Sequence, residues 1–260
     1  MAGSVNNLGQ KFELHGYTVF FDIKDSLAAE SILDSLDRAT PILKQVFNLS
    51  DEPKGVFYLV NDGSEVESIL GTPAKPNESV RLDLLTDTVC IILSRIDAAN
   101  CGEIAVKELG HLIFNKAVNE REIRMRQWRT PSWLREGIVL QAAYKVRQDQ
   151  IQWLQTGWEK LQTAQKNGQL IKPVMMLKEI TLMSDAAKKE LALMQSFYMV
   201  RLLLTIYCDS FFSKYSTLMK ALEDMESETC FRQITSFSFD KFYSMFENWV
   251  QKTNAWTAME

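Results

Sequence analysis

Histidine is scarce in this sequence, which holds only His15 and His111 among its 260 residues. A metal site that needs two or three imidazole ligands therefore has almost nothing to draw on. Cysteine is sparse as well, and its four residues form neither a C-x-x-C pair nor the spacing of a small disulfide-bonded domain. We expect reduced, mostly buried thiols at Cys90, Cys101, Cys208 and Cys230.

Long apolar runs and an excess of positive charge are also missing. No stretch approaches the ~18 consecutive apolar residues of a membrane span, and residues 1–7 lack the basic and apolar regions of a signal peptide. The net charge is −4 and the pI is about 5.4, whereas a dedicated nucleic-acid binder needs a basic surface. We therefore expect a cytoplasmic protein with no membrane span and no nucleic-acid partner.

The composition is that of an ordinary globular protein, with 46% hydrophobic and 24% charged residues. Strand-like and helix-like patterns alternate over the first hundred residues. Apolar and β-branched runs predict strands over 17–23, 56–60, 80–85 and 88–94. Helical spacing of apolar residues predicts helices over 26–47 and 64–70.

From residue 100 onward the pattern is almost wholly helical. The first helix is predicted over 100–118, and Thr130-Pro131 supplies a start signal for the next one. Further helices are predicted near 149–167, 173–180, 184–212, 214–225, 227–235 and 238–252. The sequence therefore predicts an α+β fold, with a mixed lobe over 12–118 and an all-helical lobe over 119–252 that together form one unit.

The segment KELGH, residues 107–111, carries the chemistry. Positions four apart share a helix face, so Lys107 and His111 point the same way with Glu108 beside them. The same geometry makes H-E-x-x-H a zinc motif. A lysine ammonium has no lone pair to offer a metal, and removing its proton at neutral pH costs roughly 4–5 kcal/mol.

Three segments in order resemble the gluzincin metallopeptidases, and more narrowly the peptidase MA-like domains. KELGH is similar to HExxH except at its first residue. PSWLREG, residues 131–137, resembles the family's P-x-W-L-x-E-G segment, and QSFYMVRLL, residues 195–203, resembles the helix after the zinc ligands. The resemblance covers roughly residues 12–252 and implies a thermolysin-like, gluzincin-like fold.

The resemblance also implies a role for each matching residue. His111 matches the second zinc ligand, Glu136 the third, and Glu108 the general base. Tyr198 is either the relic of a residue that steadies the oxyanion or a core aromatic. Lys107 stands where the first ligand belongs, and we expect it to replace the metal's charge by pairing with Glu108 and Glu136. His15, the only other imidazole, precedes the first predicted strand.

The resemblance therefore implies a catalytically degenerate metallopeptidase that needs no cofactor and acts by binding a protein or peptide. One alternative is an atypical active zinc metallopeptidase, with Glu108 as general base and zinc held by His111 and Glu136. Another is a regulatory subunit or an inactivated form. The predicted strands between residues 80 and 94 supply an edge for an extended peptide. An arginine cluster is either a solvated connector or a surface for an anionic partner: Arg121, Arg124, Arg126 and Arg129.

Overall fold

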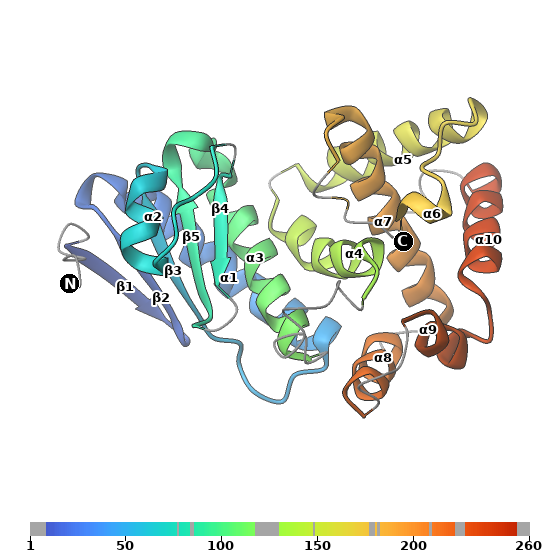
Figure 1. Ribbon diagram of the computed structural model, residues 1–260, viewed down its shortest axis with the longest axis horizontal. Coiled ribbons are helices and arrows are strands. Elements are labelled where there is room, and N and C mark those ends of the chain that lie inside the picture. The colour runs from blue at the N-terminus through green and yellow to red at the C-terminus, as the bar shows by residue number, and fades with distance from the viewer. Residues whose placement is uncertain are drawn as a thin grey trace. The chain divides into compact units, whose positions relative to one another are not determined.

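The computed structural model describes residues 9–76, 78–83, 86–117, 130–147, 149–176, 180, 183–207, 210–221 and 227–253. The architecture is α+β: one mixed sheet is formed by the N-terminal part of the chain, and helices dominate the remainder (Figure 1). The chain divides into two compact units. The first comprises Met1–Asn115 and Ala142–Val146, and the second comprises Lys116–Gln141 and Arg147–Glu260. The lobes predicted over 12–118 and 119–252 stay a prediction, and the assignment of 142–146 to the first unit has no sequence signal.

The sheet of the first unit has the strand order β1-β2-β3-β5-β4. Its inner strands β2, β3 and β5 run parallel, and each edge strand is antiparallel to its neighbour. The strands are β1 (Gln10–Leu14), β2 (Tyr17–Phe21), β3 (Gly55–Val60), β4 (Val80–Asp83) and β5 (Thr88–Ile92).

Strand β1 is an addition to the predicted elements. Its sequence, QKFEL, is largely exposed and polar, so it lacks the pattern of a buried strand. Two residues in the left-handed region, His15 (φ 49°) and Gly16 (φ 89°), form the tight turn that pairs β1 with β2. His15 therefore lies between two strands and not before the first one.

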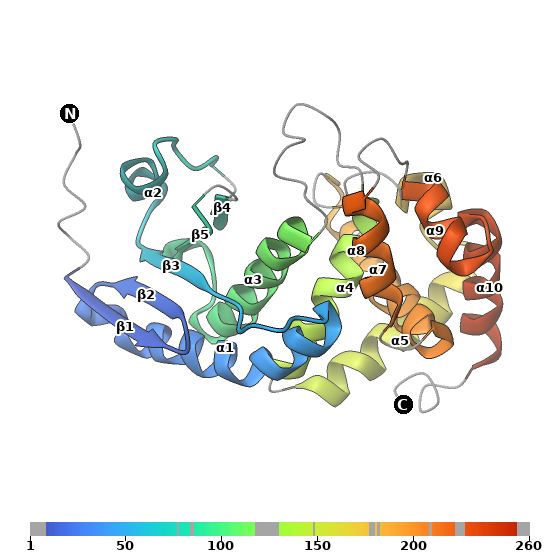
Figure 2. The same cartoon turned by 90° about the horizontal axis from the view of Figure 1, so that it is seen from below.

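Helices cover both faces of this sheet. Helices α1 (Ser26–Phe47) and α3 (Cys101–Ala117) lie on one face, and α2 (Gly63–Leu70) lies on the other (Figure 2). The first face receives every second residue of β2, which are all buried: Tyr17, Val19 and Phe21. On the second face, Val66 of α2 packs against buried residues of β3 and β5, namely Val60, Cys90 and Ile92.

The described residues of the second unit form helices joined by turns and loops, and none of them lies in a strand. Its helices are α4 (Ser132–Ala143, which ends in the first unit), α5 (Gln150–Lys166), α6 (Pro173–Met176), α7 (Ala186–Tyr207), α8 (Ser210–Ala221), α9 (Ser227–Thr235) and α10 (Phe239–Lys252). Short 3-10 turns occur at Ile23–Asp25, Leu93–Arg95, Ala98–Asn100 and Tyr144–Val146.

The predicted helix over 184–212 is wrong at its C-terminal end. Helix α7 ends at Tyr207, and the hydroxyl of Ser210 donates to the carbonyl of Tyr207. No single helix among the described residues is long and apolar enough to span a membrane. Among the described helices, α7 and the start of α8 together have the length and apolar composition of a span, but the two helices are bent by 101° relative to each other.

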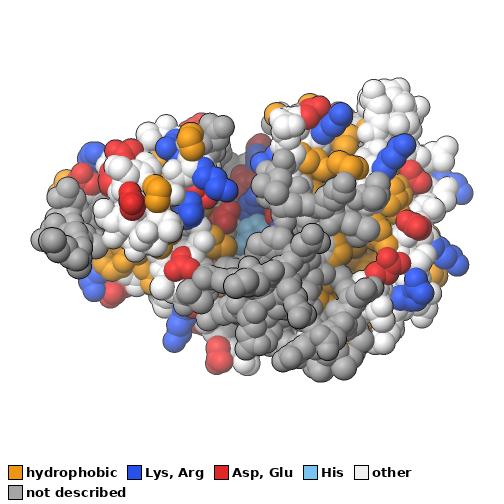
Figure 3. Space-filling model, in the orientation of Figure 1, with side chains coloured by type: hydrophobic (Ala, Val, Ile, Leu, Met, Phe, Trp, Pro, Cys, Tyr) orange, Lys and Arg blue, Asp and Glu red, His pale blue; other side chains and the backbone are white. Residues whose placement is uncertain are grey.

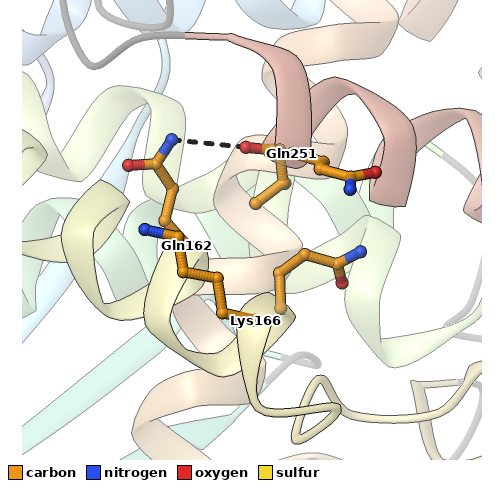
Figure 4. A pocket seen from close by; sticks show the side chains of 5 residues that line it. Gln162, Lys166 and Gln251 are labelled. Carbon is orange, nitrogen blue, oxygen red and sulfur yellow. Dashed lines mark hydrogen bonds between the residues drawn. The ribbon is translucent and has the colours of Figure 1, made fainter.

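A side-chain amide joins α5 to the end of α10 in the second unit. The Nε2 of Gln162 on α5 donates to the carbonyl of Val250 at 3.4 Å (Figure 4). The same nitrogen also donates to the carbonyl of Thr253 at 3.0 Å, just past the end of α10. The hollow beside this contact has a volume of about 330 Å³, and Gln165, Lys166 and Gln251 complete its lining. Its lining offers amides and one ammonium, a set that lacks a carboxylate or imidazole for acid–base chemistry.

Candidate functional site

Helix α3 carries the KELGH segment and packs against the sheet of the first unit. Ala105, Val106 and Leu109 are fully buried. Leu109 lies over the start of β3, where a Cβ on Gly55 would come within 3.3 Å of the leucine Cδ1. This close packing fixes the rotation of α3 about its own axis and therefore the direction of the motif side chains.

The motif residues occupy the less buried side of α3. Lys107 and Glu108 are half-buried, and His111, one turn later, is 8% exposed. Because residues four apart share a helix face, the ammonium of Lys107 and the imidazole of His111 lie on one side of α3. The helix predicted from the motif spacing is confirmed, and it carries an ammonium where HExxH carries its first imidazole.

Glu136 belongs to the second unit, where it lies in α4 and is 1% exposed. The neighbouring Arg135 is also buried, and its Nε lies 3.8 Å from Oε1 of Glu136. This distance makes the contact an ion pair and not a hydrogen bond. A buried carboxylate is costly unless it has a countercharge, and the guanidinium of Arg135 contributes one.

The backbone around Glu136 is held from several directions. Trp133 stacks on Phe239 and Phe242, with ring centroids 5.2 Å and 5.9 Å away. Gly137 lies where any Cβ would overlap the backbone carbonyl of Ser196 on α7. One turn later, Gln141 donates to the carbonyl of Phe197 at 2.8 Å. The glycine of the P-x-W-L-x-E-G segment thus has a physical role, because it permits close contact between α4 and α7.

Tyr198 lies in the core of the second unit. It is fully buried, and its hydroxyl donates to the carbonyl of Leu154 at 2.6 Å. Its ring makes edge contacts with Phe197 and Trp158, whose centroids are each 5.0 Å away. This geometry favours the core reading of Tyr198 over a role near substrate.

His15 lies on the surface of the first unit, where it contacts a carboxylate. Its Nδ1 lies 2.8 Å from Oδ1 of Asp37 on α1, and both side chains are about half exposed. The predicted partner-binding arginines, Arg121, Arg124, Arg126 and Arg129, lie outside the described residues. Three of the four cysteines are confirmed as free and buried: Cys90, Cys101 and Cys230. Burial raises the pKa of the Cys90 thiol to about 12, so this thiol stays protonated.

The donor set does not fit a catalytic zinc site of the gluzincin type. Such sites use three protein ligands, whereas the matching positions here supply one imidazole (His111), one carboxylate (Glu136) and one ammonium (Lys107). The guanidinium of Arg135 beside Glu136 would also repel a divalent cation. In the part of the chain that the structure describes, no group of three or more His, Cys, Asp or Glu side chains is placed to hold a metal ion.

Two residues within the motif segments have roles that the sequence did not predict. Arg135 pairs with its own neighbour, although consecutive helix residues ordinarily diverge. Gln195 is fully buried and makes three hydrogen bonds with its amide. The sequence signal for this role of Gln195 was its position as a polar amide within a largely apolar helix. The expected pairing of Lys107 with Glu108 and Glu136 stays a prediction.

Comparison with known proteins adds no assignment to this geometry. No family model and no curated protein matches the chain.

Proposed function

We propose that this chain is a gluzincin-like protein with a degenerate metal site, and that it acts by binding a protein or peptide. The order of its elements supports this proposal: a mixed sheet, a motif helix, a second helix with the PSWLREG segment, and a helical remainder. The proposal includes the thermolysin-like arrangement of these elements and the relic roles of Glu108, His111 and Glu136.

The main support for a degenerate metal site is the position of Lys107. It lies one helical turn before His111 on the less buried side of α3, where the family pattern requires an imidazole. An ammonium at this place supplies positive charge without a metal and cannot act as a ligand while protonated. The buried pair of Arg135 and Glu136 supports the same view, because the carboxylate has a cationic neighbour of its own.

Peptide binding has a separate structural support. Strand β4 ends the sheet and is hydrogen-bonded to β5 on one side. An edge strand can accept an extended peptide as a further strand through main-chain hydrogen bonds. This use of the sheet requires no metal.

Zinc loading followed by elemental analysis tests the proposal. The purified chain is incubated with zinc, desalted and analysed, alongside Lys107→His and the control Lys116→His. The control adds a histidine to an exposed position of the same helix. We expect no tightly held zinc in the wild type and in Lys116→His, and a gain of zinc binding in Lys107→His.

About one zinc per wild-type chain contradicts the degenerate reading. A peptide-cleavage assay with Glu108→Gln as its companion variant sharpens the result. Cleavage by the wild type that disappears in Glu108→Gln would establish instead an active zinc peptidase with Glu108 as general base.

A further inference from the structure

A cavity of about 740 Å³ lies in the second unit, where the chain passes from α5 to α7. It is lined by residues 168–172, by Met175 of α6, by residues 183–185 and by Lys188 in the first turn of α7. None of these residues belongs to the KELGH or PSWLREG segments. Mainly apolar cavities of roughly 300–1,000 Å³ with a few polar groups are typical small-molecule sites.

The wall of this cavity is firmly held. Gly168, with φ +63°, follows the C-cap of α5, and the N–H of the next residue, Gln169, donates to the carbonyl of Ala164 at 2.8 Å. The buried amide of Gln195 accepts from the N–H of Ile171 (3.0 Å) and donates to its carbonyl (2.9 Å). The hydroxyl of Tyr243 donates to the same carbonyl at 2.6 Å. A wall fixed in this way lowers the entropy cost of binding a ligand.

The lining of the cavity is largely apolar. Leu170, Ile171, Met175 and Met183 contribute to it. Met175 is 40% exposed, one of few large hydrophobic side chains so exposed in the described part of the chain. The space-filling view shows hydrophobic side chains gathered over α6 and α7 (Figure 3). Methionine side chains are flexible and polarisable, so they adapt to the shape of an alkyl chain.

The charges at this cavity favour an anionic head group. The carboxylate of Asp185 caps the start of α7. Its Oδ1 accepts from the N–H of Lys188 at 3.1 Å, and this bond lowers the pKa of the carboxyl. The ammonium of Lys188 lies 3.7 Å from Oδ2 of Asp185. Lys172 is exposed and forms no ion pair with any residue that the structure describes. Among the described residues, the lining of this apolar cavity therefore carries one cation, Lys172, that has no countercharge.

We propose that this cavity binds a free medium-chain fatty acid, with the alkyl chain along Leu170, Met175 and Met183 and the carboxylate at Lys172. This inference is independent of the proposed function. Each methylene that leaves water on binding strengthens affinity about fourfold. Decanoate, with two methylenes more than octanoate, therefore binds roughly 15-fold more tightly.

Calorimetric titration of the full chain with decanoate, below its micelle concentration, tests the proposal. Saturable binding at one site is expected. Met175→Lys places an ammonium in the apolar lining and weakens binding at least tenfold. Lys172→Glu weakens binding about three- to tenfold, the scale of an exposed ion pair turned into a repulsion. The control Lys214→Glu makes the same charge change on α8 and stays within twofold of the wild type.

Two comparisons separate this site from nonspecific adsorption. In protein labelled with ¹³C at the methionine methyl groups, decanoate shifts the Met175 and Met183 signals and leaves the buried Met219 of α8 unchanged. Melting curves of each variant establish that it is folded. Absence of saturable binding overturns the proposal, as does equal binding by all variants or tighter binding by Met175→Lys. Binding to anionic phosphatidylglycerol vesicles without binding of decanoate overturns it too.

Discussion

Each of the two units brings a pair of helices together at a glycine, but the atom nearest to an added Cβ belongs to a side chain in one unit and to the backbone in the other. In the first unit, a Cβ on Gly102 of α3 would overlap the side chain of Ser35 on α1. In the second unit, a Cβ on Gly137 of α4 would overlap the backbone carbonyl of Ser196 on α7. A side chain can change its rotamer or be replaced, whereas a helix backbone can yield only if the whole helix moves.

The same contrast extends to buried polar groups. Where α1 covers the sheet, a short chain of hydroxyls is buried, in which Tyr17 bonds to Thr40 and Thr40 donates to the carbonyl of Leu36. The second unit buries the amides of Gln141 and Gln195, each bonded to the backbone of another segment. We infer that the second unit depends more on specific geometry and tolerates substitution less.

The largest expected effect is that of Gly137→Ala. Overpacking a helix contact costs about 1–3 kcal/mol and more when backbone must move, so we expect a loss near 3 kcal/mol despite alanine's better helix propensity. Urea unfolding monitored by tryptophan fluorescence measures this loss, since Trp133 lies on the same helix. Gly9→Ala is the control, because nothing lies within 4 Å of its Cβ position. A change below 0.5 kcal/mol in Gly137→Ala (roughly the surface-substitution range) would contradict the close contact of α4 and α7.

A smaller loss, about 1–2 kcal/mol, is expected for Gly102→Ala in the first unit. The main obstacle there is the Ser35 side chain, so Ser35→Gly should relieve much of the clash. A double-mutant cycle of Gly102→Ala with Ser35→Gly then gives a favourable coupling energy. Strict additivity of the two substitutions would show that the contrast between the two glycines is wrong.

The elements of the first unit are the more predictable from sequence. Helix α1 has the predicted bounds, because its apolar period ends at Phe47 and Asn48 then adopts the left-handed conformation (φ 50°) that closes the helix. Strand β1 was missed because an exposed edge strand carries little apolar pattern. In the second unit, the end of α7 at Tyr207 was missed because aromatic and apolar residues continue beyond it.

The candidate site was predictable only in its local part. The spacing of Lys107 and His111 defines one helix face wherever the helix forms. The ion pair of Arg135 with Glu136 could not be predicted, because consecutive residues of a helix ordinarily point in different directions. The cavity beside Lys172 depends on Gln195 and Tyr243, which lie far from it in sequence and meet only in the folded chain.

The buried tyrosines test whether the polar contrast matters for stability. We expect Tyr17→Phe to lower stability at pH 7 by about 1 kcal/mol and Tyr243→Phe by up to about 2 kcal/mol. Tyr17 makes one hydroxyl contact, whereas Tyr243 bonds to both Ile171 and Gln195. Thermal unfolding of both variants under matched conditions gives the comparison. Equal losses of stability in the two variants would show that buried polar groups do not distinguish the two units.

The pH dependence of Tyr17 has a defined sign. Burial raises the pKa of its phenol to about 12, above the ordinary value near 10. The folded state favours the protonated phenol. The contribution of this phenol to the stability of the folded protein is therefore complete below pH 10 and is lost as the pH rises from 10 to 12. The stability difference between wild type and Tyr17→Phe should therefore shrink over that range. A difference that stays constant from pH 8 to pH 12 would contradict this burial effect.

The smallest effects on stability are expected at two helix caps near the surface. Loss of either cap should cost the two units about the same. Asp62 accepts from the N–H of Ser64 at 2.8 Å at the start of α2, and Ser238 accepts from the N–H of Lys241 at 3.3 Å at the start of α10. Replacing either with alanine should cost about 0.5–1 kcal/mol. A much larger cost at Ser238 would show that the sensitivity of the second unit extends to its surface.

Acid distinguishes the two caps by charge. The hydrogen bonds from Ser64 lower the pKa of Asp62, so this cap is complete above the ordinary carboxyl pKa and is lost as the pH falls below it. The cost of Asp62→Ala should therefore disappear in acid, whereas that of Ser238→Ala should not change, since a hydroxyl does not titrate there. Amide hydrogen exchange of Ser64 and Lys241 between pH 3 and pH 7 measures both caps separately. Parallel acid responses would mean that the Asp62 contact acts through its geometry and not through its charge.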